Sequence, residues 1–155
     1  MIETMKIDQL ELVAPLWEDL NALHQTLDEM CGRPRRETKW EERLVQLREK
    51  AQGPHLFQII RCYGKPSGYC FTSIDANSKG EIDSIYVLPE CRGKGFGKAL
   101  VQNALEWLEQ SKCEDIEISV HPANTKAIAF YWDFGFATGH TMKRLTQKSL
   151  TKEHQ

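Results

Sequence analysis

The most informative part of the chain reads Ile85-Tyr86-Val87-Leu88-Pro89-Glu90-Cys91-Arg92-Gly93-Lys94-Gly95-Phe96-Gly97-Lys98. Its first residues are typical of a strand, and the apolar spacing that follows predicts an amphipathic helix over Phe96–Lys112. Glycines between a strand and a helix let the backbone approach a ligand closely, and the free amides at a helix start face an anion. The side chains of Arg92, Lys94 and Lys98 add positive potential. The pattern therefore predicts a phosphate or pyrophosphate site.

Two common phosphate-binding motifs do not fit this stretch. A Walker P-loop needs a glycine five residues before Gly97 and a hydroxyl residue after Lys98, but Arg92 and Ala99 stand there. A dinucleotide fingerprint that starts at Gly93 would have to end on a glycine, and that position is Lys98. A glycine-rich turn whose basic side chains lie in solvent remains the structural alternative.

The elements around this stretch indicate a mixed α/β sheet. Apolar residues recur every three or four positions over Leu10–Leu27, which predicts a helix with a kink or restart at Pro15. A second helix is expected to open at Thr38, with Glu41 completing a capping box. The other predicted elements are strands at 55–63, 68–74, 81–88 and 116–121, a turn at 64–67, a helix at 124–134, and one or two strands within 136–145. Helices, an antiparallel meander and then alternating strands and helices favour an α/β fold.

The composition is typical of one soluble globular domain. The chain has 155 residues, of which 41% are hydrophobic and 27% charged. We expect a single domain over 1–150 and a frayed tail at 151–155. The net charge of −2 argues against nucleic-acid binding, and no apolar run is long enough for a membrane span. With no secretory segment expected, we predict a cytoplasmic protein.

The cysteines support the same location and predict no metal site. There are five, with no Cys-x-x-Cys pair among them. Scattered thiols fit a reducing cytoplasm. Cys91 lies beside Arg92, which could lower the pKa of the thiol, so a nucleophilic cysteine is an alternative. A loop thiol without an assigned base is more often a bystander.

Two motifs together resemble the GNAT N-acetyltransferase superfamily. The first is Arg92-x-x-Gly95-x-Gly97, preceded by a strand and a proline, and the second is Asn124-x-x-Ala127-x-x-Phe130-Tyr131-x-x-x-Gly135-Phe136. With the elements between them, they cover roughly residues 81–136, whereas the first 50 residues match only in being helical. The resemblance implies a GNAT-like fold, with a central, twisted, mostly antiparallel sheet of about six or seven strands flanked by about four helices.

The resemblance also implies a set of site residues and acetyl-CoA as co-substrate. Loop residues would hold the pyrophosphate, namely Arg92, Gly93, Lys94, Gly95, Phe96, Gly97 and Lys98. The strand segment Ile85, Tyr86 and Val87 would pair with the pantetheine arm, and its backbone would polarise the thioester. Asn124 would contact the cofactor, and Tyr131 would protonate or hydrogen-bond the departing thiolate. The structural alternatives are a helix N-cap for Asn124 and a packed aromatic for Tyr131.

A protonated amine must lose a proton before it can attack, so a general base is needed. Strand alternation places Glu81, Asp83, Ile85 and Val87 on one face, with both carboxylates on the track to the thioester. Some family members carry a glutamate base at the position of Glu81. We therefore rank Glu81 first, Asp83 second and His121 third. The other histidines, including His24, His55 and His140, show no ligand spacing and are treated as structural or exposed.

The predicted activity is acetyl transfer from acetyl-CoA to a primary amine by direct attack in a ternary complex. No covalent enzyme intermediate and no metal are expected. The alternatives are a non-catalytic acyl-CoA-binding sensor or regulatory module and, with less support, a phosphate-binding domain of another fold. The acceptor is a small-molecule amine or a protein amino group, and many relatives are homodimers.

The region before the meander offers two kinds of acceptor recognition. In the family, the first helices and the loop between them shape the acceptor site. That loop carries Arg33, Arg35 and Arg36, which suit a carboxylate or phosphate on the acceptor. Nearby acidic residues would instead favour a polyamine or an aminoglycoside-like cation, and these are Glu18, Asp19, Asp28 and Glu29. Both sets are also explained as solvated faces.

Overall fold

The computed structural model describes residues 1–137 and 142–144 and contains a seven-stranded sheet with the order β1-β2-β3-β4-β5-β7-β6. The strands are β1 (Ile2–Thr4), β2 (His55–Cys62), β3 (Lys65–Ile74), β4 (Gly80–Val87), β5 (Ile116–Ile118), β6 (Phe136–Ala137) and β7 (Met142–Arg144). The helices are α1 (Ala14–Met30), α2 (Trp40–Lys50), α3 (Phe96–Gln110) and α4 (Thr125–Trp132), with 3-10 helices η1 (Ile7–Val13) and η2 (Pro89–Cys91). The β4–β5 pair is parallel, and every other pair in this sheet is antiparallel. The predicted α/β fold is confirmed, whereas His140 and the tail at 151–155 lie outside the described residues.

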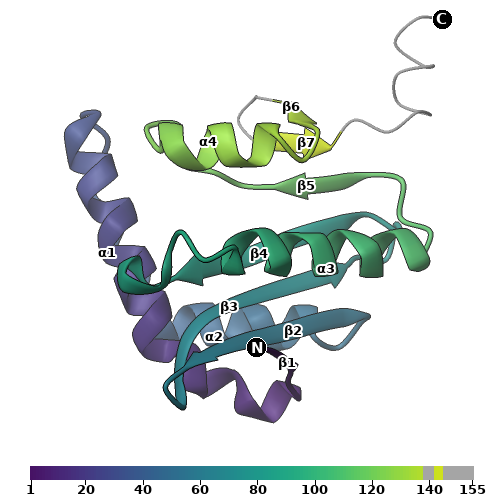
Figure 1. Ribbon diagram of the computed structural model, residues 1–155. Coiled ribbons are helices and arrows are strands. Elements are labelled where there is room, and N and C mark those ends of the chain that lie inside the picture. Colours follow the sequence, from purple (N-terminus) through teal and green to yellow (C-terminus); the bar gives the residue numbers. More distant parts are fainter. Residues whose placement is uncertain (138–141, 145–155) are drawn as a thin grey trace, which may run out of the picture.

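Helices cover both faces of the sheet, with α3 in front and α2 behind in Figure 1. One core cluster joins α3 and α4 to the sheet, and a second joins η1, α1 and α2 to it. Neighbouring residues on β2 enter different clusters, since Ile59 belongs to the second and Ile60 to the first, and both are fully buried. The central strands are therefore buried on both faces, which fixes their register.

The sequence pattern predicts the start of α1 correctly but not the capping of α2. Pro15 lies in the first turn of α1, where its missing amide costs no helical bond, so the predicted restart is confirmed. Helix α2 begins at Trp40, and Lys39 precedes it without a side-chain cap, so the capping box of Thr38 and Glu41 is wrong. The carbonyl of Thr38 instead accepts a hydrogen bond of 3.3 Å from the Asn21 side chain, which ties this segment to α1.

The β2–β3 turn is shorter than the predicted one. Cys62 pairs with Lys65, so only Tyr63 and Gly64 lie between the strands. Their φ angles are 54° and 78°, and positive φ at both central residues is what a type I′ hairpin turn requires. The strand β3 therefore begins at Lys65, within the segment that the sequence pattern assigned to the turn.

Strand β4 contains a β-bulge at Asp83. Phe71 of β3 pairs with Ser84, and Thr72 pairs with Ile82, so Asp83 is an extra residue in β4. An extra residue turns the following side chains to the face opposite to the one that simple alternation gives. The residues after the bulge therefore change sides of the sheet.

The bulge overturns the prediction that Glu81, Asp83, Ile85 and Val87 share one face. Glu81 and Asp83 both form ion pairs with Lys50 of α2. Ile85 and Val87 pack into the other core, with α3 and α4. The carboxylates and the apolar side chains thus lie on opposite sides of β4.

A substitution at Gly80 tests the contact between β4 and α3. A Cβ atom at Gly80 would lie 2.6 Å from Cδ2 of Leu108, which is fully buried. We expect Gly80→Ala to lower the free energy of unfolding by about 1–3 kcal/mol through overpacking. Gly53→Ala is the matched control, since its nearest atom would be at 3.5 Å, and it should stay within about 1 kcal/mol of the parent. Equal stability of the two variants in urea denaturation would contradict this packing.

Candidate active site

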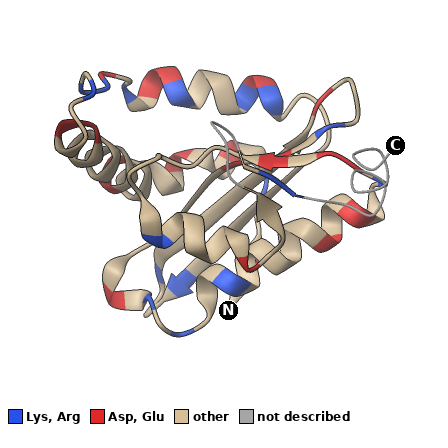
Figure 2. Cartoon of the chain, turned by 90° about the horizontal axis from the view of Figure 1, so that it is seen from above, with Lys and Arg blue, Asp and Glu red and all other residues tan. Residues whose placement is uncertain are grey.

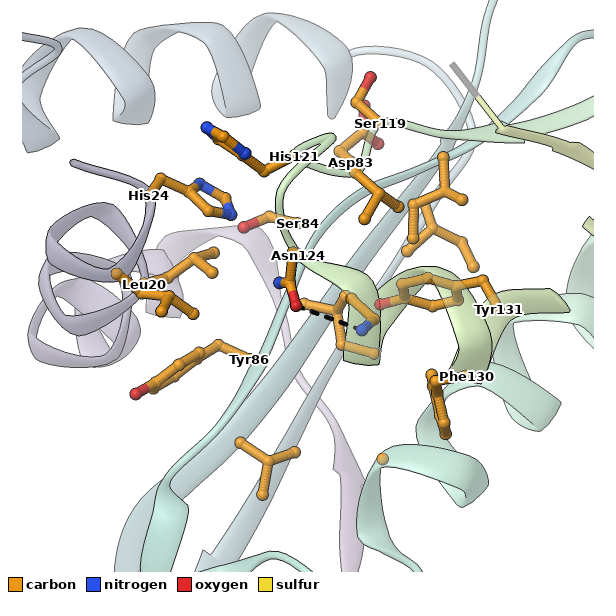
Figure 3. Close-up of a pocket in the computed structure, with 18 of the residues that line it drawn as sticks. Leu20, His24, Asp83, Ser84, Tyr86, Ser119, His121, Asn124, Phe130 and Tyr131 are labelled. Carbon is orange, nitrogen blue, oxygen red and sulfur yellow. Dashed lines mark hydrogen bonds between the residues drawn. The ribbon is translucent and has the colours of Figure 1, made fainter. Parts of the chain in front are cut away.

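A cavity of about 1060 Å³ lies where β4 and β5 part (Figure 3). The two strands pair only from Gly80 to Ile82 of β4, and β5 ends at Ile118, earlier than the sequence pattern predicts. Beyond this point both the remaining part of β4 and the segment after β5 line the cavity. Helix α1, the glycine loop and α4 complete its wall. The site is therefore a gap in the sheet that helices enclose.

The backbone of β4 presents hydrogen-bonding groups to this gap. The amide of Leu88 donates to Ser67 on β3 at 2.9 Å, so Leu88 turns its backbone groups toward β3. In an antiparallel pair this orientation alternates, so Ile85 and Val87 turn theirs away from β3 and toward the gap. The Val87 carbonyl accepts a bond of 2.9 Å from Nε of Arg92, which agrees with that orientation. The Val87 amide and both groups of Ile85 face the position where a further strand would pair.

The side chain of Arg92 has a structural partner rather than a free charge. Besides its bond to Val87, its guanidinium lies 5.4 Å from the ring centroid of Tyr86. Its amide also donates to the Pro89 carbonyl at 3.2 Å. Arg92 therefore joins the end of β4 to the glycine loop, and two further exposed cations of the loop are Lys94 and Lys98.

The glycine loop supplies unpaired amides at the start of α3. Gly93 and Gly95 have φ angles of 79° and 81°, a conformation that side chains other than glycine rarely adopt. Ala99 donates to the Gly95 carbonyl at 3.0 Å, so the amides of Phe96, Gly97 and Lys98 precede this helical bond. Residues 95–98 all line the cavity. The positive end of the helix dipole therefore faces it, as an anion site requires.

Helix α4 carries the second motif to the opposite wall. The Asn124 side chain accepts a bond of 3.2 Å from the Ala127 amide, so it caps the helix as the structural alternative predicted. Tyr131 is buried, with its ring 5.1 Å from that of Phe130 and 6.1 Å from that of Phe136. Burial raises the pKa of Tyr131 well above its ordinary value, and its hydroxyl forms no hydrogen bond within the described residues. Tyr131 therefore keeps its proton and can donate a hydrogen bond to a ligand in the cavity (Figure 3).

The two candidate carboxylates of β4 differ in what surrounds them. Asp83 is fully buried, and it accepts bonds of 2.5 Å from Lys50 and 2.6 Å from Ser73. Glu81 is 29% exposed and lies 3.4 Å from the same lysine. Burial and the charge of Asp83 raise the pKa of Glu81. Asp83 is thus held by structural donors, and Glu81 is the carboxylate with access to solvent and a basicity above the ordinary range.

His121, the third candidate base, has both ring nitrogens occupied. Its Nε2 lies 2.7 Å from Oδ1 of Asp28, and its Nδ1 accepts a bond of 3.0 Å from the Ala123 amide. An Nδ1 that accepts carries no proton, so the proton of the neutral ring lies on Nε2 and is donated to Asp28. The side chain is fully buried. In this arrangement His121 has no lone pair for a substrate.

Asp28 lies at the centre of a buried hydrogen-bond network that the sequence did not predict. Arg36 donates to Asp28 from its side chain at 3.1 Å and from its amide at 3.2 Å, and Nη1 of Arg36 lies 3.1 Å from Nδ1 of His24. The Arg36 hydrogen bond and that of His121 hold the pKa of Asp28 far below its ordinary value. Burial and the Arg36 charge lower the pKa of His24 to about 4. No local pattern could reveal a contact between residues 93 positions apart, such as Asp28 and His121.

The alternative of a nucleophilic cysteine finds no support at Cys91. The side chain is buried. Contact with the thiol of Cys62 and burial raise the pKa of Cys91, the opposite of the lowering that Arg92 was expected to cause. Within residues 1–137 and 142–144, no group of three or more His, Cys, Asp or Glu side chains is placed to bind a metal ion. None of the described helices combines the length and apolar character of a membrane span.

Removing the charge of Lys50 should destabilise the protein, because the buried Asp83 carboxylate then lacks its cation. We expect Lys50→Met to lower the free energy of unfolding by about 3 kcal/mol, since it leaves a buried charge without its cation. Arg48→Met is the matched control on the same helix, because Arg48 is exposed, and it should change stability by less than about 0.5 kcal/mol. Equal effects of the two substitutions in urea denaturation would show that the ion pair between Lys50 and Asp83 does not stabilise the fold.

Comparisons with known proteins agree with this geometry. The model described as acetyltransferase (GNAT) family matches residues 17–136. An uncharacterized N-acetyltransferase of Methanocaldococcus jannaschii is 31% identical over 93 residues, which are 56% of this chain and 41% of the relative. A mycothiol acetyltransferase of Streptomyces griseus subsp. griseus is 34% identical over 86 residues, which are 55% of this chain and 28% of the relative. The chain thus matches less than half the length of these two curated relatives.

A solved structure extends the likeness to nearly the whole fold. The PaiA N-acetyltransferase of Thermoplasma acidophilum, crystallised with coenzyme A, superposes with a TM-score of 0.65. The match covers 92% of this chain and 95% of that one at 21% identity, so it shows a shared fold. The family match spans the glycine loop, the parting of β4 from β5 and helix α4. The chain therefore belongs to the acetyltransferase (GNAT) family.

Proposed function

We propose that this protein transfers the acetyl group of acetyl-CoA to a primary amine. The observation that carries the proposal is the convergence of three features on one cavity. Within the described residues, these are the free amides at the start of α3, the unpaired Val87 amide and Ile85 backbone groups, and the hydroxyl of Tyr131, which forms no hydrogen bond. An anion, an extended amide-bearing chain and a leaving group each find a complementary partner there.

Acetyl-CoA would bind along β4 as an additional strand. The helix start and the exposed Lys94 and Lys98 favour the pyrophosphate. The arm with its two amides would pair with Ile85 and Val87, as a peptide pairs with an open sheet edge. The amide of Val87 would then donate to the thioester carbonyl and stabilise the oxyanion. The side chain of Val87, which is buried, would serve only packing.

The chemical step proposed is a direct attack within the ternary complex. The neutral amine forms a bond to the carbonyl carbon, the nitrogen loses its surplus proton to water, and the carbon–sulfur bond then breaks to release the CoA thiolate. A thiol has an ordinary pKa near 8.5, well below that of buried Tyr131. Tyr131 therefore donates a hydrogen bond to the thiolate rather than giving up its proton completely.

Glu81 is the proposed general base. Its raised pKa makes it a better proton acceptor than an ordinary glutamate, and its exposed fraction allows a water molecule to relay the proton. Asp83 is proposed as the residue that raises the basicity of Glu81 and fixes Lys50, because its own oxygens are held by Lys50 and Ser73. His121 is not proposed as a base, since both nitrogens are bonded.

The setting proposed for this activity is the cytoplasm. All five cysteines are free, which fits a reducing compartment. A homodimer, which the resemblance implies for many relatives, stays a prediction. A non-catalytic acyl-CoA sensor is the alternative function, and turnover separates it from the enzyme.

A charged side chain in the glycine loop should abolish acetyl-CoA binding. We expect Gly95→Glu to weaken binding at least about 100-fold, because it places a carboxylate beside the amides proposed for the pyrophosphate. Gly64→Glu is the matched control, since Gly64 has a similar φ of 78° and equally open surroundings but lies in the β2–β3 turn. Calorimetric titration with acetyl-CoA measures both variants. Parent-like affinity of a folded Gly95→Glu protein would refute the loop assignment.

Removing the Tyr131 hydroxyl should slow the reaction and leave binding intact. We expect Tyr131→Phe to lower kcat about 10- to 100-fold, with the Kd for acetyl-CoA within about twofold of the parent. Tyr63→Phe makes the same chemical change at a side chain that is 99% exposed, and it should have no effect. Release of CoA, measured with a thiol reagent, gives the rates. An unchanged kcat would remove Tyr131 from the chemistry.

A further inference from the structure

The wall of the cavity formed by α1 and the α1–α2 connection is basic. Arg33 and Arg36 of the connection line it, and so does His24 of α1. Figure 2 shows basic residues gathered on this connection. Arg35 of the same connection does not line the cavity and instead pairs with Glu29 on the surface. Two of the three arginines that the sequence offered therefore face the site.

The acidic residues near this wall do not face the cavity. Glu18, Asp19, Asp28 and Glu29 are all absent from its lining. Asp28 is buried, forms an ion pair with Arg36 and accepts a hydrogen bond from His121. The carboxylates that do line the cavity within the described residues are Glu81 and Asp83, which share Lys50. A polycationic acceptor would thus meet positive charge at this wall.

His24 presents a hydrogen-bond donor to the cavity. An arginine can only donate, so Nδ1 of His24 accepts from Arg36 and carries no proton. The proton of the neutral ring therefore lies on Nε2, which has no partner among the described residues. Figure 3 shows His24 and His121 on one side of the cavity and Phe130 and Tyr131 on the other. This N–H suits an oxygen acceptor such as a carboxylate.

Among the described residues, Arg33 is the arginine of the cavity whose guanidinium forms no hydrogen bond with the protein. Arg36 is bound to Asp28, Arg43 donates to the Asp83 carbonyl at 2.7 Å, and Arg92 donates to Val87. In the described part of the chain, no side-chain partner is recorded for the Arg33 guanidinium. Its backbone is nevertheless fixed, because the Arg33 amide donates to the Asp28 carbonyl at 2.8 Å. The backbone of Arg33 is thus held in place, while its guanidinium is free to bind a ligand.

We propose that the acceptor is an amine that also carries an oxyanion, a carboxylate or a phosphate. This inference rests on the proposed acetyl transfer and names its substrate class. Arg33 binds the oxyanion as a charge partner, and the N–H of His24 donates to it. The protonated amine is drawn toward Glu81 of β4, which removes its proton. A cavity with a basic wall and one accessible carboxylate thereby selects a substrate of the same bipolar character.

The first test compares acceptors that differ only in the anion. Amino acids, their amides, aminoalkyl phosphates and the polyamine spermidine are offered with acetyl-CoA, and CoA release is measured. An amino acid or an aminoalkyl phosphate should give a KM at least about tenfold lower than the uncharged amide. The better of the two identifies the anion. Faster turnover with spermidine or with the amides than with either anionic amine overturns the inference.

The second test asks whether Arg33 reads the anion. Arg33→Gln should raise the KM for the anionic acceptor about tenfold, with an unchanged KM for acetyl-CoA. Arg33→Glu should raise it further and improve the use of spermidine. Arg35→Gln is the matched control, since Arg35 is exposed and outside the cavity, and its KM values should stay at the parent level. Equal effects at Arg33 and Arg35 would overturn the role of Arg33.

The outcomes separate this inference from the proposed function. Turnover with acceptors of the wrong charge contradicts the inference and leaves acetyl transfer standing. If no acceptor releases CoA, acetyl transfer fails, and calorimetric binding of N-acetyl amino acids and N-acetylaminoalkyl phosphates then decides the inference. Binding that Arg33→Gln weakens about tenfold supports an oxyanion site. Equal binding by the parent and the variant, or none by either, overturns it.

Discussion

The site depends on the parting of β4 from β5 after three paired residues. Pairing over the full length of β4 would satisfy the backbone of Ile85 and Val87 and fill the cavity with sheet. The parting instead leaves an open edge inside a folded domain, where helices exclude other chains. Such an edge normally invites aggregation, so its enclosure by α1 and α4 protects the protein while it keeps the edge available to an extended ligand.

A salt bridge and a buried hydrogen bond, each to an aspartate, hold the two sides of this gap at fixed positions. Lys50 of α2 ties down the bulge in β4 through Asp83, and Asp28 of α1 ties down the segment after β5 through His121. Such pairs add little net stability compared with apolar packing, but each breaks at a high cost once one partner is lost. Their consequence here is geometric. They fix where the acceptor wall stands relative to the unpaired strand edge, and burial together with the charge of Asp83 raises the pKa of Glu81.

Features set by near neighbours in the chain could be predicted from the sequence, and those set by distant contacts could not. The glycine loop and its helix follow from local pattern, as does the restart of α1 at Pro15. The two polar residues Asp83 and Ser84 between Ile82 and Ile85 break the alternation, but only the pairing with β3 shows that the break is a bulge with one extra residue in β4. The Asp28 network could not be predicted either, because it joins Asp28 to His121, which is 93 positions away in the sequence. The two site motifs could therefore be predicted from the sequence, whereas the orientation of their side chains and the composition of the acceptor wall could not.

Amide chemical shifts during titration with acetyl-CoA show whether the ligand pairs with the open edge of β4. We expect the resonances of Ile85, Val87 and residues 96–98 to shift on binding, because their amides face the cavity. The amides of Ser84 and Tyr86 face β3 and should shift much less, and ATP and NAD should not reproduce the strand pattern. An alternation of this kind along β4 would establish that the ligand pairs with the open strand edge. Shifts confined to another surface, or no response to acetyl-CoA, would contradict the account.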